Sequence, residues 1–221
     1  MNLSLRGIAR RYKSITGGFS VTRNIFDVSK IIGTVSLRSK LESMAREEHS
    51  EEISECIYGW TAAFEQTWTH IRIRIMLNPD AGISTATMNT LRTTWQNGIQ
   101  NTWSNRWGCG RSGELTCPLT FEVVWVNSNQ HHTVTVGVPA PNANPPHPTV
   151  MTHWHTNDGG GVAAHEYGHM LGNVDEYISA TLCPARNPVS TGTVMDNNTA
   201  NIPARMMTRF ADNIGSNIVA L

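Results

Sequence analysis

The sequence lacks a net charge, a long apolar run and an internal repeat. Its 221 residues carry 17 Lys and Arg against 17 Asp and Glu, so the basic surplus typical of a general nucleic-acid-binding protein is missing. No run of about 18 apolar residues occurs, and no membrane-spanning helix is predicted. No repeated unit of a solenoid or propeller is visible. At about 100–200 residues per domain, the length indicates one domain with an appended segment.

Cysteine is scarce, and none of the four cysteines lies in a CxxC pair. A structural zinc knuckle is therefore not indicated. Cys109 and Cys117 flank a seven-residue loop and are expected to form a disulfide if the protein resides in an oxidising compartment. Four reduced cysteines in a cytosolic protein are the equally weighted alternative, so the sequence leaves the redox environment open.

The N-terminal part has no apolar h-region, so no classical secretory signal peptide is expected. Residues 1–30 have 6 basic and 1 acidic side chains (+5), residues 31–60 have 3 and 6 (−3), and residues 61–221 have 8 and 10 (−2). We therefore expect a charged N-terminal leader with a helical segment over 1–60 and a near-neutral domain over 61–221. Helical spacing of apolar residues predicts an amphipathic helix over 38–57.

From about residue 69 onward, hydrophobic periodicity predicts mixed α and β structure. Strict alternation of Ile71, Ile73, Ile75 and Leu77 is typical of a strand. A 3-4-4-4 apolar stripe predicts a helix over about 85–104, capped by Ser84 or Thr85. The other predicted elements are a loop over 108–113, a hairpin formed by 119–126 and 132–138, a Pro-rich loop over 139–148, a short strand over 149–155, a helix over about 161–172 ending at Gly172, and a last helix around 203–214.

Histidine, in contrast, is concentrated: five of the nine lie within 23 residues, where an even spread would place about one. Two of them belong to the sequence His165-Glu166-Tyr167-Gly168-His169. On a helix, His165 and His169 lie one turn apart on the same face and can bind one zinc ion. Glu166 lies beside that face and can act as general base, accepting a proton from a water that the metal activates.

A third metal ligand is expected shortly after the helix. Gly172 can adopt a left-handed C-cap that turns the chain sharply, which would bring Asp175 to the metal and leave a fourth position for water. Glu176 is the immediate competitor for this role, and Asp196 is a further candidate in an aspzincin-like arrangement. A distant Glu, as in gluzincins, is disfavoured because few acidic residues follow His169.

The pattern HExxHxxGxxD resembles the zinc signature of the metzincin metallopeptidases, whose snapalysin-like members carry Asp as the third ligand. The resemblance covers about residues 69–210 and implies that His165, His169 and Asp175 are ligands and Glu166 is the base. It also implies a Met-containing turn beneath the metal, for which Met195 in the segment 191–196 is the candidate.

The fold implied by this resemblance is α+β. It has a twisted mixed sheet with an antiparallel edge strand, a long backing helix and an active-site helix. A small irregular C-terminal subdomain follows, and the cleft lies between 61–172 and 173–221. An extended substrate would pair with the edge strand near 149–155 by β-augmentation.

The resemblance leaves some roles unassigned. Some metzincins place an oxyanion-stabilising Tyr two residues after the turn methionine, but Asn197 stands there, so Tyr177 is the candidate substitute. His153 and His155 alternate on the strand before the helix, and are candidates for the substrate strand or for a second metal site. His147 is expected at the rim of the cleft.

The sequence therefore predicts a zinc-dependent endopeptidase that acts on a protein or peptide substrate. The charged leader without a signal peptide favours a toxin or effector exported by a specialised bacterial secretion system. A component of the secretion apparatus or an immunity or inhibitor protein would then be its partner. A non-catalytic zinc-binding module or interaction protein is the alternative. It is disfavoured because structural zinc sites usually have four protein ligands, and only three are evident.

Overall fold

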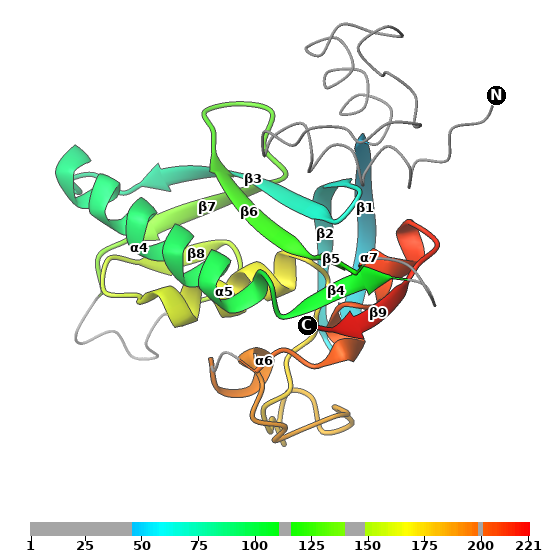
Figure 1. Ribbon diagram of the computed structural model, residues 1–221. Helices are drawn as coiled ribbons and strands as arrows, with labels where there is room; N and C mark the ends of the chain where they lie inside the picture. The colour runs from blue at the N-terminus through cyan, green and yellow to red at the C-terminus, as the bar shows by residue number, and fades with distance from the viewer. Residues whose placement is uncertain (1–45, 111–115, 140–148, 199–200) are drawn as a thin grey trace, which may run out of the picture. The chain divides into compact units, whose positions relative to one another are not determined.

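The structure is a computed structural model that describes residues 46–110, 116–139, 149–198 and 201–221 (Figure 1). Glu47–Leu221 form one compact unit, an α+β fold with a six-stranded mixed sheet and a three-stranded sheet. The predicted leader up to residue 45, the Pro-rich loop over 140–148 and His147 within it lie outside the described residues. No helix in the described ranges is long and apolar enough to cross a membrane.

The main sheet has the strand order β1-β2-β3-β7-β8, with β6 also paired to β3. Strand β2 runs antiparallel to β3, whereas β6, β7 and β8 run parallel to their neighbours. The edge strand β8 is therefore parallel to β7, and the expected antiparallel strand is not found at that edge. The strands are β1 (Arg46–Glu55), β2 (Tyr58–Thr67), β3 (His70–Pro79), β6 (Thr120–Trp125), β7 (His132–Gly137) and β8 (His153–His155).

One face of the sheet is covered by the helices α4 (Thr85–Trp103) and α5 (Gly160–Met170) (Figure 1). The alternation in β3 is confirmed, because Ile71, Ile73 and Ile75 are fully buried under these helices. Helix α4 matches the predicted range and begins at the Ser84 cap, whose hydroxyl accepts the backbone N–H of Thr87 at 3.1 Å. Its apolar stripe is buried against α5 and the sheet: Met88, Leu91, Trp95, Ile99 and Trp103. This packing fixes the position of α5.

The predicted hairpin over 119–138 is wrong. Strands β6 and β7 follow one another along the same edge of β3 and run in the same direction. The chain leaves β3 where Val126 N donates to Ile75 O at 3.0 Å, and it returns where His131 N donates to Arg74 O at 2.8 Å. The polar stretch between them is thus a loop within one interrupted strand. Turn-forming residues are equally suited to such a loop and to a hairpin.

The predicted helix over 38–57 is also wrong where the structure describes it, because residues 46–55 form strand β1. Spacing by four places Ile53 and Ile57 on one helical face, yet Ile57 is 72 % exposed and belongs to no core. Pairing with β2 decides the conformation instead, as tertiary context commonly overrides a weak local pattern. The predicted domain boundary at residue 60 falls within β2, while the compact unit begins at Glu47.

The second sheet was not predicted. It has the order β5-β4-β9, and its strand β4 occupies part of the segment expected to be a loop. The predicted last helix is divided into two short helices, and the chain then returns to this sheet. The elements are β4 (Trp107–Gly110), β5 (Cys117–Pro118), η1 (Ala204–Met206), α7 (Thr208–Asn213) and β9 (Asn217–Ala220).

The cysteines pair differently from either expectation. Cys56 and Cys183 form a disulfide across 127 residues of sequence, whereas Cys109 and Cys117 are free thiols that face each other across β4 and β5. The short sequence spacing between Cys109 and Cys117 favoured a disulfide between these two. Cys56 and Cys183 come together only in the folded chain. This bond ties the end of β1 to the segment that follows α5.

We expect Cys183→Ser to lower the free energy of unfolding by about 2–5 kcal/mol, because a cross-link that closes a long loop restricts the unfolded chain. Urea unfolding of the oxidised protein measures this difference. Cys117→Ser, which removes a half-buried free thiol, is the matched control. Equal stability of Cys183→Ser and the oxidised wild type would contradict the expectation.

Candidate metal centre

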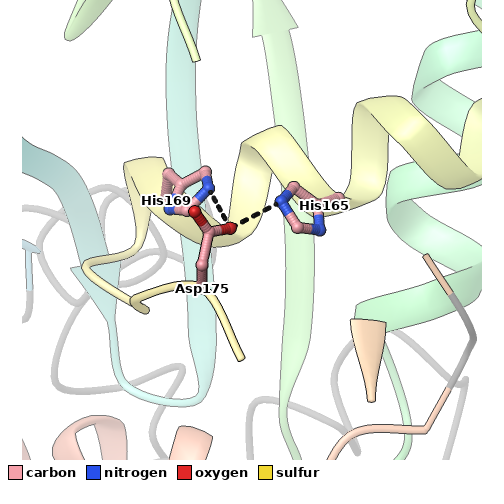
Figure 2. Close-up of side chains that lie close together, drawn as sticks. All are labelled: His165, His169 and Asp175. Carbon is pink, nitrogen blue, oxygen red and sulfur yellow. Dashed lines mark hydrogen bonds and ion pairs between the residues drawn. The ribbon is translucent and has the colours of Figure 1, made fainter. Parts of the chain in front are cut away.

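Helix α5 and the turn after it bring His165, His169 and Asp175 together. Each imidazole Nε2 lies 3.1 Å from the same carboxylate oxygen, Asp175 Oδ1 (Figure 2). His165 and His169 are one turn apart and face the same side, as their i,i+4 spacing requires. Among the described residues, they are the one group of three or more His, Cys, Asp or Glu with metal-binding proximity.

The turn at Gly172 produces this convergence. Gly172 has φ +89°, a left-handed conformation that glycine adopts at low cost. Its N–H donates to His169 O at 2.8 Å, and Asn173 N donates to Gly168 O at 2.9 Å. These bonds end the helix and direct the chain back toward the two imidazoles, as expected for a left-handed C-cap.

The backbone fixes the tautomer of both imidazoles. His165 Nδ1 donates to Val194 O at 2.7 Å, and His169 Nδ1 donates to Asn173 O at 2.9 Å. A carbonyl oxygen only accepts, so each Nδ1 carries the hydrogen and each Nε2 faces the Asp175 oxygen. Three acceptor atoms facing one another require a cation between them, either a proton or a metal ion. Such bonds on the outer ring nitrogen are typical of histidines that bind metals.

The charges suit a cation as well. Burial disfavours the ionised form of Asp175, but the hydrogen bonds to His165 and His169 outweigh it and hold the pKa of this carboxyl well below its usual range. The pKa of His165 is raised, because burial is outweighed by its bond to Asp175 and by the charge of Glu166. Asp175 is therefore ionised at neutral pH.

Glu166 lies beside the group and is 5 % exposed. Burial raises its pKa, although the neighbouring His169 and His165 oppose this shift. Its Oε2 is buried without a hydrogen-bond partner among the described residues. A buried carboxylate oxygen without a partner is costly and uncommon away from functional sites, so we interpret it as facing a site that a ligand or water completes.

These residues fit a divalent transition metal. Ligand atoms that lie 2.0–2.1 Å from a tetrahedral ion are about 3.3 Å from one another, close to the 3.1 Å between each Nε2 and Asp175 Oδ1. Two imidazoles and one carboxylate form a donor set found at catalytic metal sites. The described part of the chain thus contains a group of three residues that could hold a metal ion.

The two competing acids are engaged elsewhere. The Glu176 carboxylate accepts hydrogen bonds from Thr191 Oγ1, from Thr193 Oγ1 at 2.5 Å and from Arg205 Nη2 at 2.6 Å. Asp196 accepts the N–H of Gly192 at 2.7 Å. Both acids therefore shape the turn over 191–196, and neither belongs to the group with the two histidines.

Met195 lies directly against helix α5. It is fully buried at the start of α6 (Val194–Asn197), and a Cβ added to Gly168 would lie 2.4 Å from its sulfur. Gly168, between the two histidines in sequence, thus allows this close contact. The same turn supplies the Val194 carbonyl that fixes His165. The predicted turn methionine therefore packs against α5 between its two histidines.

Tyr177 lies beside the group and not within it. Its side chain is half-exposed, and the Arg186 guanidinium lies 4.6 Å from the centroid of its ring. Burial and the nearby charge of Asp175 raise the pKa of Tyr177 to about 12. The hydroxyl therefore stays protonated and can donate a hydrogen bond at neutral pH.

His153 and His155 lie side by side on β8, with ring centroids 4.9 Å apart. His155 is held by Thr149, whose hydroxyl lies 3.0 Å from its Nδ1, and its backbone N–H donates to Asp158. Within the described ranges these residues complete no second group of three metal ligands. They occupy the edge of the sheet a few residues before α5.

Three further residues at the site were not predicted: Trp60, Arg186 and Glu55. Trp60 Nε1 donates to His169 O at 2.8 Å, and its ring meets the imidazole edge-on. Arg186 lies 3.5 Å from Asp175 and binds Glu55. No periodicity or motif connects Glu55 or Trp60 with the HExxH segment, so local patterns could not identify them.

Comparisons of the chain with protein-family models, with curated proteins and with solved structures find no match.

Proposed function

We propose that the protein is a zinc-dependent metalloendopeptidase. The observation that carries this proposal is the convergence of His165, His169 and Asp175. Beside them lies the buried Glu166, whose Oε2 has no hydrogen-bond partner among the described residues. The resemblance of HExxHxxGxxD to the metzincin signature supports the same function, as do the Met195 turn and the mixed sheet with a long helix on one face.

Three ligands favour a catalytic site over a structural one. His165, His169 and Asp175 would hold the zinc, and a catalytic zinc site characteristically has three protein ligands with the fourth position open. When bound, zinc acts as a Lewis acid and lowers the pKa of a coordinated water to about 7. Structural zinc sites are usually closed by four protein ligands.

The chain's own residues supply the proton transfers. Glu166 takes a proton from the attacking water and delivers it to the leaving amine, and its raised pKa brings it closer to the working pH, as general acid–base catalysis requires. Tyr177 remains protonated and donates to the carbonyl oxygen of the scissile bond. The peptide pairs with the edge strand β8 through its backbone, beside His153 and His155.

An exported effector or toxin role is part of the proposal. The disulfide between Cys56 and Cys183 is typical of proteins that function in an oxidising environment. A component of a secretion apparatus, and an immunity or inhibitor protein, remain the proposed partners. Expression of the chain in the cytoplasm and in the periplasm of a naive bacterial host, with and without neighbouring genes, tests this part through growth.

The central test measures zinc and hydrolysis together on the full chain. We expect about one zinc per chain, cleavage of an unfolded protein substrate, loss of cleavage on treatment with a chelator, and recovery when zinc is added back. Zinc bound without cleavage of any member of a broad panel of unfolded proteins would favour a non-catalytic zinc-binding module. A chain that binds no zinc would overturn the proposal.

A further inference from the structure

The two carboxylate oxygens of Asp175 face different groups. Oδ1 lies 3.1 Å from both imidazole Nε2 atoms, whereas Oδ2 lies 3.5 Å from Arg186 Nη2. The guanidinium is thus placed on the side of the carboxylate that faces away from the histidines. A cation shared by the histidines would meet one oxygen and Arg186 the other.

Arg186 is itself held rigidly. Its Nε and Nη2 donate to the two oxygens of Glu55 at 2.8 Å and 2.9 Å, and its Nη1 donates to Tyr177 O at 2.9 Å. The Arg186 side chain is only 2 % exposed. A bidentate pair of this kind fixes both the position and the plane of the guanidinium.

The strand that carries Glu55 is anchored to the same region. Cys56, the next residue, forms the disulfide with Cys183, which lies three residues before Arg186. Trp60 of β2 contacts His169. The end of β1, the turn after it and the start of β2 therefore contact both the end of α5 and the segment that follows it.

The charges explain why an arginine can lie so close to a cation site. Glu55 balances the charge of Arg186, so Asp175 keeps its negative charge toward the histidines. The guanidinium lies 3.5 Å from Oδ2 and would favour keeping that oxygen directed away from a cation between the histidines. Asp175 would then offer a bound metal one oxygen, Oδ1.

We propose that Arg186, fixed by Glu55, is a positioning residue that holds Asp175 as a single-oxygen metal ligand. This inference rests on the proposed zinc site. It assigns a role in metal binding to two residues that lie outside the HExxH segment, and it connects strand β1 to the metal centre.

The test compares zinc affinity in Arg186→Gln, Arg186→Lys and Glu55→Gln, measured by competition with a chromophoric chelator. Loss of a residue that orients a metal ligand typically weakens binding by about 10–100-fold, and we expect this for Arg186→Gln. Arg186→Lys keeps the charge but lacks the planar fork, so it does not restore the affinity. Glu55→Gln weakens binding in the same direction while Arg186 remains present.

A second readout separates positioning from general loss of structure. The visible absorption of the Co²⁺-loaded protein reports coordination, and we expect it to change in Arg186→Gln. Arg74→Gln is the matched control, because Arg74 pairs with Glu48 and Glu65 on the sheet. It is expected to lower the urea midpoint with zinc affinity unchanged within about twofold.

The outcomes separate this inference from the proposed function. Wild-type affinity and an unchanged Co²⁺ spectrum in Arg186→Gln would overturn the inference, as would full affinity in Arg186→Lys. The wild type could bind zinc and cleave no peptide, while the variants bind zinc more weakly. That result would support the inference and contradict the peptidase proposal. A wild-type chain that binds no zinc would overturn both.

Discussion

Replacing Glu166 with Gln is expected to reduce peptide hydrolysis by about 10²–10⁴-fold, the contribution of a positioned general base, with the zinc content unchanged. Gln has nearly the same shape but cannot take a proton from water. Glu166 lies outside the group of three residues that could hold a metal ion, so its replacement is expected to leave metal binding intact. Steady-state cleavage of a fluorogenic peptide, together with metal analysis of the same sample, measures both quantities.

The stability of this variant gives an independent check. The Glu166 Oε2 is buried without a hydrogen-bond partner in the described part of the chain, so an amide is expected to leave the protein at least as stable. Glu52→Gln, an exposed change of the same kind on β1, is the control for both measurements. Full activity in Glu166→Gln with normal zinc content would show that another group is the base.

Replacing Asp175 with Asn is expected to weaken zinc binding by at least about 100-fold, more than the loss of an orienting residue usually costs. The neutral amide lacks the charge that the two histidines face across 3.1 Å. Glu176→Gln, one residue later, is the matched comparison. It replaces one of the two carboxylate oxygens that accept from Thr191, Thr193 and Arg205 with an N–H donor and removes their charge. This change is expected to cost about 1–3 kcal/mol of stability, with zinc affinity nearly unchanged.

Chelator competition and urea unfolding on the two variants distinguish a ligand from a structural acid. The expected pattern is loss of affinity in Asp175→Asn and loss of stability in Glu176→Gln. The reverse pattern would assign the third ligand to Glu176. Equal zinc affinity in both variants and the wild type would contradict a three-ligand site on this turn.

Sequence could predict the parts of the site that are set by local geometry. The spacing of His165 and His169 places them on one helix face, and Gly172 permits the left-handed turn that returns the chain to them. Strand β3 and helix α4 follow in the same way from alternation and from a helical stripe. Each of these features depends on interactions between residues that are close in sequence. A periodic pattern of apolar residues can therefore predict them.

The parts that could not be predicted depend on contacts between distant segments. Glu55 and Arg186 are 131 residues apart, and their pairing requires β1 to be placed at the edge of the sheet. The direction of β7 depends on its pairing with β3 and not with β6 as in a hairpin, because its own residues suit either direction. The choice of Asp175 over Glu176 as the candidate third ligand likewise required knowledge of the hydrogen-bond partners of Glu176. These partners come from residues 191–193 and from Arg205, later in the chain.

The bond between Cys56 and Cys183 also has a consequence for the order of events during synthesis. At about 5–20 residues per second, Cys56 waits roughly 6–25 s for a partner that is 127 residues further along the chain. Cys109 and Cys117 precede Cys183 in the chain, so two other thiols are synthesised before the partner of Cys56. Once the second sheet has formed, burial raises the pKa of the Cys109 thiol to about 12, and a protonated thiol exchanges poorly. Because strand β9 of that sheet follows Cys183 in the chain, this burial protects the finished Cys56–Cys183 bond from exchange with Cys109, and with it the attachment of β1 to the segment after α5.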